Sequence, residues 1–204
     1  MNTPNKLTVS RLVMAPIFFI AFHLPIWVDP RLSKLSAILI IILWVLTELS
    51  DLLDGQIARR ANLVTDLGKV MDPFADTISR MTYFVCFISV SMMPIWAFIL
   101  IMWRELSILF VRMLMMGKGA AVPANIWGKS KAVLYAISGA LGILAVNLGV
   151  WAPDSALSAV VQKSLNPVFA LAAVASVISF LTYVKAILGS GALSRSEERR
   201  VGKE

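Results

Sequence analysis

The sequence predicts an all-α integral membrane protein with six transmembrane helices and both termini in the cytoplasm. Hydrophobic residues make up 58% of the 204 residues, and charged residues make up only 15%. The mean hydropathy is +0.80. A chain of this length with so little polar surface cannot form a soluble globule with a polar exterior. The fold class therefore follows from composition, and the number of helices follows from the apolar runs.

Six apolar runs are near the length that crosses a bilayer, because about 20 helical residues span its hydrocarbon core. They lie at residues 12–28, 35–50, 77–92, 94–116, 132–152 and 165–187. Pro94 separates two of them, since proline disfavours a continuous helix. The second run ends in Glu48 and Asp51, so we expect its last turns to line a water-reachable cavity. A single transmembrane domain thus covers residues 1–189, and a disordered tail is predicted for residues 190–204.

The basic residues predict the orientation. With the N-terminus in the cytoplasm, fifteen of the 19 lysines and arginines fall on the cytoplasmic side. Only Arg31, Lys34 and Lys163 fall outside, and Arg104 lies within a helix. This bias follows the rule that cytoplasmic loops carry the excess of Lys and Arg. We therefore attribute the net charge of +7 to contacts with anionic lipid headgroups and to the orientation of the helices, and not to nucleic-acid binding.

Residues 51–76 carry the most informative pattern in the chain. Four carboxylates occur as two pairs, Asp51 with Asp54 and Asp72 with Asp76. Spacings of three and four place each pair on one helix face. Like charges about 4 Å apart repel by roughly 1 to 4 kcal/mol per pair, so the cluster needs a counter-charge. A hard divalent cation with oxygen ligands, Mg²⁺ or Mn²⁺, would supply it. The alternative is an acidic, solvated helix end without chemistry.

The same segment has the order D-x-x-D-G-x-x-A-R, then Gly68, Asp72 and Asp76. This order resembles the signature of the CDP-alcohol phosphatidyltransferase family, with every fixed position matched. Further blocks resemble the phosphatidylglycerophosphate synthase branch of that family. These blocks are Asn5–Thr8 with Arg11 and Pro16, Arg104–Glu105 with Arg112, and Gly128–Lys131.

The resemblance implies transfer of a phosphatidyl group from CDP-diacylglycerol to an alcohol. It implies that Asp51, Asp54 and Asp72 hold the metal, and that Asp76 is the general base within reach of a second metal. The implied CDP-binding residues are Gly55, Ala58, Arg59 and Gly68. The two glycines would allow close backbone approach of the nucleotide, and the arginine would pair with phosphate oxygens.

The acceptor is expected to be glycerol 3-phosphate. The residues expected to bind its phosphate are Arg104, Arg112, Lys129 and Lys131. A charged side chain within an apolar membrane helix is energetically costly and usually faces a cavity. The spacing of eight residues between Arg104 and Arg112 suggests that both arginines lie on one face of the helix. The alternative is a purely structural ion pair between Arg104 and either Glu105 or Glu48. Lys6, Thr8 and Arg11, expected just before the first helix, are open to two readings, substrate contact or an interfacial anchor.

Other functions stay open at this point. Within the family, inositol phosphate or phosphatidylglycerol are alternative acceptors. An intramembrane prenyltransferase also pairs aspartates with Mg²⁺, but no Asp or Glu occurs from Leu106 to Pro153 or from Ser155 to Ser196 to form a second acidic motif. A non-enzymatic cation carrier is the remaining class. The basic residues place the active site on the cytoplasmic side of the cell (inner) membrane, and the family resemblance implies a homodimer.

Overall fold

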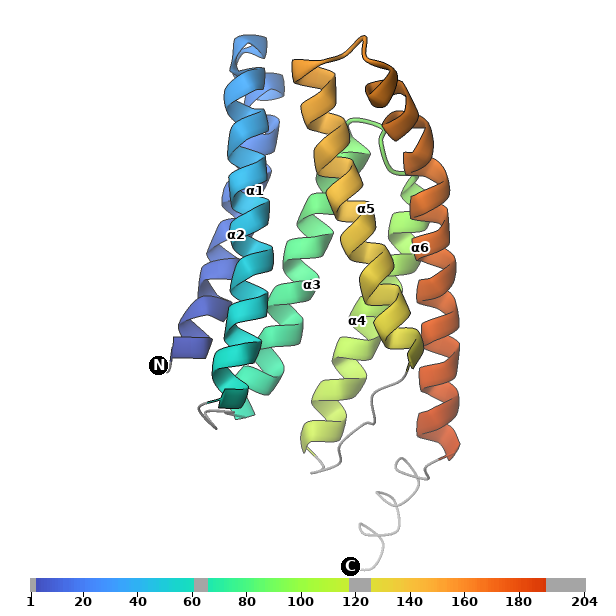
Figure 1. Cartoon of the computed structure of the whole chain (residues 1–204). Helices are drawn as coiled ribbons and strands as arrows, with labels where there is room; N and C mark the ends of the chain where they lie inside the picture. Colours follow the sequence, from blue (N-terminus) through green and yellow to red (C-terminus); the bar gives the residue numbers. More distant parts are fainter. Residues whose placement is uncertain (1–2, 61–65, 118–125, 190–204) are drawn as a thin grey trace, which may run out of the picture.

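The computed structural model describes residues 3–60, 66–117 and 126–189. Six long helices follow one another in these ranges (Figure 1). They are α1 (Thr3–Trp27), α2 (Ser33–Arg60), α3 (Asp66–Ser89), α4 (Ile95–Gly117), α5 (Ile126–Trp151) and α6 (Ala156–Gly189), with a short 3-10 turn, η1 (Pro30–Leu32), between α1 and α2. No strand occurs within the described ranges. The all-α prediction is confirmed.

Four helices extend well beyond the predicted apolar runs: α1, α3 and α6 begin earlier, and α2 ends later. The first helix begins at Thr3 and not at residue 12, so Lys6, Thr8 and Arg11 lie inside α1 rather than before it. The last helix begins at Ala156 and continues through Pro167. These differences arise because apolarity alone defined the runs, whereas a helix continues through polar residues that face a cavity or an interface.

The break between α3 and α4 confirms the turn expected at Pro94. Helix α3 ends at Ser89, and α4 begins at Ile95. Ser91 has a φ of 59° in this turn, a left-handed conformation that non-glycine residues adopt infrequently. The amide of Ser91 donates to the carbonyl of Ile88 at 2.9 Å, and the amide of Met92 donates to that of Phe87 at 2.8 Å. These bonds satisfy carbonyl groups at the end of α3.

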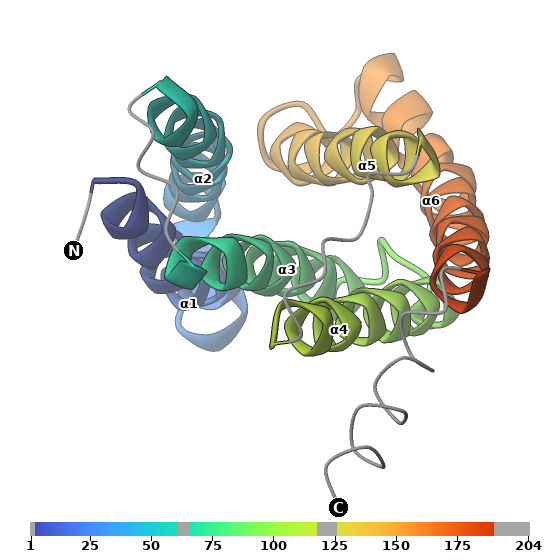
Figure 2. The ribbon, with the colours of Figure 1, turned by 90° about the horizontal axis from the view of Figure 1, so that it is seen from below.

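The helices pack as two neighbouring groups joined through α3. Helix α1 packs against α2 and α3, while α6 packs against α4 and α5, and α2 also contacts α5. The view along the bundle shows α3 between α1 and α4 (Figure 2). Aromatic side chains fill the centre: the ring of Phe84 lies 5.7 Å from that of Phe169 and 6.0 Å from that of Tyr135. The core thus connects α3, α5 and α6 directly above the charged cavity described below.

Small residues allow close helix packing in this bundle. A Cβ on Gly142 of α5 would lie 2.4 Å from Cε2 of Phe87 on α3, a distance that non-bonded carbon atoms do not tolerate. Ser176 and Ser179 on α6 are also buried. Close approach of backbones at such positions is typical of helices packed in membranes.

Four of the six helices are long and apolar enough to cross a membrane: the segments Asn5–Trp27, Pro30–Leu53, Ser130–Trp151 and Ala156–Lys185. Helices α3 and α4 have comparable lengths of 24 and 23 residues, but they carry the charged residues of the cavity. The start of α1 and the end of α6 lie at the same end of the bundle (Figure 1). The protein is a membrane protein, and six crossings with cytoplasmic termini remain a prediction.

Candidate active site

Helices α1, α2 and α3 bring two of the predicted metal ligands together. Arg11 on α1 forms a close ion pair with Oδ1 of Asp51 on α2. Its Nη2 lies 3.8 Å from Oδ1 of Asp72 on α3. The hydroxyl of Thr8, one turn earlier on α1, donates to the same Oδ1 of Asp72 at 2.6 Å. Asp51 and Asp72, from the two halves of the acidic motif, therefore share one arginine.

Burial separates these four residues into two layers. Thr8 is fully buried and Arg11 is 1% exposed, whereas the side chains of Asp51 and Asp72 are 44% and 48% exposed. The polar side chains of α1 thus lie behind the carboxylates, which remain accessible from the cavity. Sequence alone left Thr8 and Arg11 between anchoring and substrate contact. In the structure they instead contact the aspartates Asp51 and Asp72, which is neither of these two roles.

The donor chemistry of this group fits a hard divalent cation. Carboxylate oxygens are the ligands that Mg²⁺ and Mn²⁺ prefer, and Asp51 and Asp72 present them from two helices at one place. Within the described side chains, no three Asp, Glu, His or Cys residues form a metal-binding group. The backbone of Asp54 belongs to α2, but its side chain lies outside the described residues. The four-aspartate site therefore stays a prediction, with two members adjacent.

Asp76, the predicted general base, has a specific partner. It lies one turn after Asp72 in α3, and its Oδ1 accepts an ion-pair contact from Nη2 of Arg80 at 2.8 Å. The guanidinium carbon of Arg80 lies 5.9 Å from the ring centre of Tyr135 on α5. Sequence reasoning did not include Arg80 in the site. Its position four residues after Asp76, on the same helix face, was the available signal.

A second charged cluster joins α4, α5 and α6. Nη1 of Arg104 lies 2.9 Å from Oε1 of Glu105, and its Nη2 donates to the hydroxyl of Ser179 at 2.9 Å. Nζ of Lys131 also donates to Oε1 of Glu105, and it lies 4.7 Å from the ring centre of Tyr135. One carboxylate thus faces two cations, which leaves the cluster with an excess positive charge. We call Arg104, Glu105 and Lys131 the basic cluster.

The predicted acceptor residues are only partly brought together. Arg104 and Lys131 both contact Glu105. The contact between Arg104 and Glu105 is the structural ion pair that the sequence left open as the alternative to phosphate binding. The expectation that Arg112 shares the face of Arg104 is wrong, because Arg104 is 8% exposed and Arg112 is exposed. Eight residues advance a helix by two turns plus about 80°, which rotates the second side chain away from the first.

Several predicted site residues lie outside what the structure describes. For four of them the structure describes the backbone, in α2 and in the first turn of α5, but not the side chain. These residues are Gly55, Ala58, Arg59 and Lys129. Gly68 is buried in the first turn of α3. The predicted tail at residues 190–204 is likewise outside the described ranges. The CDP-binding group and Lys129 therefore stay predictions.

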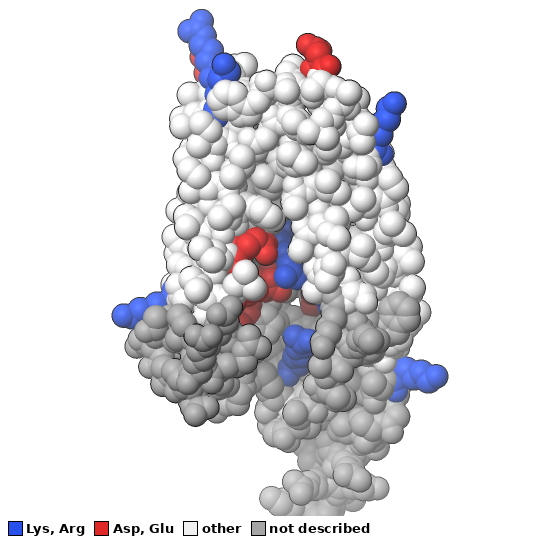
Figure 3. All heavy atoms as spheres, viewed as in Figure 1, with Lys and Arg blue, Asp and Glu red and all other residues white. Residues whose placement is uncertain are grey.

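Acidic and basic side chains meet in one hollow of the molecular surface (Figure 3). In the space-filling view, acidic and basic side chains appear together in a recess in the lower half of the bundle, and the surface above them carries no charge up to the top end (Figure 3). A recess that concentrates both signs, set beside an apolar belt, suits a ligand that is charged at one end and apolar at the other.

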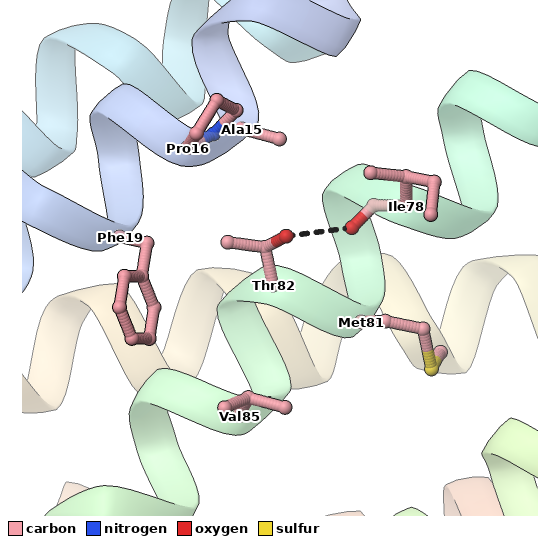
Figure 4. Close-up of a pocket in the computed structure, with 7 residues that line it drawn as sticks. All are labelled: Ala15, Pro16, Phe19, Ile78, Met81, Thr82 and Val85. Atoms are coloured by element: carbon pink, nitrogen blue, oxygen red, sulfur yellow. Dashed lines mark hydrogen bonds between the residues drawn. The ribbon is translucent and has the colours of Figure 1, made fainter.

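A separate pocket lies between α1 and α3. It has a volume of about 390 Å³ and is lined by seven residues, namely Ala15, Pro16, Phe19, Ile78, Met81, Thr82 and Val85 (Figure 4). The hydroxyl of Thr82 donates to the carbonyl of Ile78 at 2.8 Å within its own helix. The lining residues of α3 lie on the opposite face from Asp72 and Asp76 at 100° per residue. This pocket therefore plays no part in the charged site.

Comparison with known proteins identifies the family. Residues 1–181 match the family model described as CDP-alcohol phosphatidyltransferase. The chain belongs to the CDP-alcohol phosphatidyltransferase family. It is therefore an enzyme of the transferase class, and the family uses divalent metal ions. The resemblance inferred from the acidic motif is confirmed.

Individual phosphatidyltransferases give the same assignment. A protein of Treponema pallidum named CDP-diacylglycerol–glycerol-3-phosphate 3-phosphatidyltransferase is 33% identical over 140 residues, which is 66% of this chain and 65% of that protein. One of the same name from Bacillus subtilis is 33% identical over 147 residues, covering 69% and 76%. A probable phosphatidylglycerophosphate synthase of Mycobacterium tuberculosis is 27% identical over 143 residues, covering 70% and 66%. The chain thus aligns with just under two thirds of the Treponema protein.

Proposed function

We propose that this phosphatidyltransferase uses CDP-diacylglycerol as donor and glycerol 3-phosphate as acceptor, producing phosphatidylglycerophosphate and CMP in phospholipid biosynthesis. One observation carries the proposal beyond the family. Asp76 pairs with Arg80, and both Arg80 and Lys131 of the basic cluster lie beside the ring of Tyr135, at 5.9 Å and 4.7 Å from its centre. A diphosphate donor at the aspartates and a phosphorylated acceptor at the basic cluster would therefore have separate places near each other. The names of the relatives support the same pair of substrates.

The donor side of the recess is assigned to α2 and α3. Asp51, Asp54 and Asp72, with Asp76 at the edge, would hold one or two ions of Mg²⁺ or Mn²⁺. When bound, such an ion neutralises charge on the diphosphate and on the departing CMP. Gly55 and Gly68 would allow the nucleotide to approach the backbone, with Ala58 beside it, and Arg59 would contact phosphate oxygens.

The chemical step is a displacement at phosphorus. The acceptor hydroxyl oxygen forms a bond to the phosphorus of the phosphatidyl group, and the bond from that phosphorus to the CMP oxygen breaks. The hydroxyl proton passes to the carboxylate of Asp76, which acts as general base. Arg80 orients this carboxylate through the ion pair at 2.8 Å. CMP leaves with the electron pair of the broken bond.

The acceptor side is assigned to the basic cluster. Arg104 and Lys131 provide two cations against the single carboxylate of Glu105, and the resulting positive charge suits a phosphate dianion. Lys129, two residues before Lys131 in α5, is proposed to complete this group, whereas Arg112 is not, because it is rotated away from Arg104. A cationic site favours a phosphorylated acceptor such as glycerol 3-phosphate or inositol phosphate over an uncharged alcohol. Family membership removes the prenyltransferase and the cation carrier from consideration.

The proposed setting is the cell (inner) membrane, with six crossings, both termini in the cytoplasm and the charged recess facing the cytoplasm. The distribution of Lys and Arg supports this orientation, and soluble glycerol 3-phosphate is found on that side. A homodimer is proposed from family analogy alone.

The direct test is a transferase assay on the purified chain in detergent. CDP-diacylglycerol is offered with glycerol 3-phosphate, inositol phosphate, phosphatidylglycerol or glycerol, and both CMP and the lipid product are measured. We expect metal-dependent CMP release that is fastest with glycerol 3-phosphate and is abolished by a chelator. Preferential turnover of inositol phosphate or phosphatidylglycerol would refute the acceptor while leaving the family assignment intact.

A further inference from the structure

The polar end of α1 reaches the acidic motif through contacts that span a large sequence distance. Thr8 contacts Asp72 across 64 positions, and Arg11 contacts Asp51 across 40 positions. Three helices are fixed relative to one another at this point. The contacts involve only Oδ1 of each aspartate among the described residues.

The two oxygens of each carboxylate therefore have different roles. Oδ1 is taken by α1, and the remaining oxygen stays available to a ligand, in agreement with exposures of 44% and 48% for the two side chains. Groups that bind one oxygen of a ligating carboxylate fix its rotamer and its direction toward an ion. Thr8 and Arg11 are completely or almost completely buried, so they cannot serve as surface anchors.

We propose that Thr8 and Arg11 are positioning residues for the divalent metal site. They hold Asp51 and Asp72 in the geometry that binds the ion, so that little reorganisation accompanies metal binding. The guanidinium also offsets the repulsion between the two carboxylates when the ion is absent. This inference deepens the proposed function and rests on it, because it takes Asp51 and Asp72 as metal ligands.

The test measures metal binding without substrate. Mn²⁺ is titrated into the purified full chain in detergent, and free Mn²⁺ is followed by its electron paramagnetic resonance signal. Thr8→Val keeps the shape of the side chain and replaces only the hydroxyl group with a methyl group. Since loss of a group that orients a ligand typically costs 10- to 100-fold in metal affinity, we expect the Mn²⁺ dissociation constant to rise by about that factor. Arg11→Lys keeps the charge and loses the planar fork, so it should have a similar effect.

Two matched variants separate positioning from general damage. Thr8→Ser restores a hydroxyl and should bind Mn²⁺ nearly as tightly as the wild type. Thr82→Val makes the same substitution on α3, where the hydroxyl bonds only to its own helix, and it should leave Mn²⁺ binding unchanged.

The outcomes distinguish this inference from the proposed function. Mn²⁺ binding that is unchanged or tighter in both Thr8→Val and Arg11→Lys would overturn the positioning role alone. A wild type that transfers the phosphatidyl group without binding Mn²⁺ or needing any added divalent ion would overturn the metal assignment, and the inference with it. Weakened Mn²⁺ binding in a protein that prefers another acceptor would support the inference while refuting glycerol 3-phosphate.

Discussion

Glu105 offers the sharpest test of whether the basic cluster binds a phosphate. Its Oε1 contacts both Arg104 and Lys131, and its side chain is 11% exposed. Glu105→Gln keeps the size and one acceptor oxygen but removes the negative charge. The variant therefore leaves two buried cations facing each other without a counter-charge.

The expected loss of stability in Glu105→Gln follows from the burial of the ion pairs. Removing one partner of a buried ion pair costs about 3–5 kcal/mol. In a chain of this length about 2–4 °C of melting temperature corresponds to 1 kcal/mol, so the substrate-free variant should melt on the order of 10 °C below the wild type. A phosphate bound between Arg104 and Lys131 would replace the missing charge. At 100 times its dissociation constant a ligand contributes about 2.7 kcal/mol, so glycerol 3-phosphate should restore more than half of the loss.

The assay is thermal unfolding in detergent with and without glycerol 3-phosphate, with glycerol as the uncharged comparison. Glu48→Gln is the matched control, since Glu48 is the other described glutamate and lies on α2, near Asp51 and Asp76. We expect stabilisation by glycerol 3-phosphate to be larger in Glu105→Gln than in the wild type, and not enlarged in Glu48→Gln. Equal stabilisation of Glu105→Gln by glycerol and by glycerol 3-phosphate would show that the cluster only locks α4, α5 and α6 together.

Three further predictions concern single positions. Asp76→Asn should lower kcat by roughly 10²- to 10⁴-fold while donor binding is retained, because a general base acts mainly on the chemical step; an equal loss of CDP-diacylglycerol binding would make Asp76 a primary metal ligand instead. Arg104→Ala should raise the acceptor KM about ten- to a hundredfold and leave the donor KM unchanged, as expected for a lost charge-assisted contact of about 1.5–3 kcal/mol; an unchanged acceptor KM with a lower melting temperature would identify a structural arginine. Gly142→Ala should destabilise the protein by about 1–3 kcal/mol, because its Cβ would lie 2.4 Å from Phe87. Gly149→Ala, whose Cβ would meet no atom within 4 Å beyond its chain neighbours and the nearby backbone of its own helix, should not destabilise the protein in the same unfolding measurement.

The sequence predicted the parts of the site that lie close together in the chain. Asp72 and Asp76 are four residues apart, so helical periodicity alone places them on one face. The break at Pro94 is also a local property of residue type. The family signature added a chemical role for residues 51–76, and the family match confirms the family itself.

Apart from the local pair of Asp76 and Arg80, the contacts that sequence reasoning missed join distant segments. Thr8 and Arg11 lie near the start of α1, and periodicity shows that they share a face but not which helix that face meets. The structure places Asp51 and Asp72 there. The rotation of Arg112 away from Arg104 was a different error, because a spacing of eight is not a whole number of helical turns.

Charge placement explains why α3 and α4 differ from the other helices. Their charged residues exclude them from the set that is apolar enough to cross a membrane by composition, yet most of these charges are paired inside the bundle. Asp76 pairs with Arg80, and Arg104 pairs with Glu105. Ionisable groups at membrane depth are costly unless paired or placed in a polar cavity. The helices that look least like membrane spans are therefore the ones that line the recess where a water-soluble phosphate and a lipid-linked diphosphate would meet.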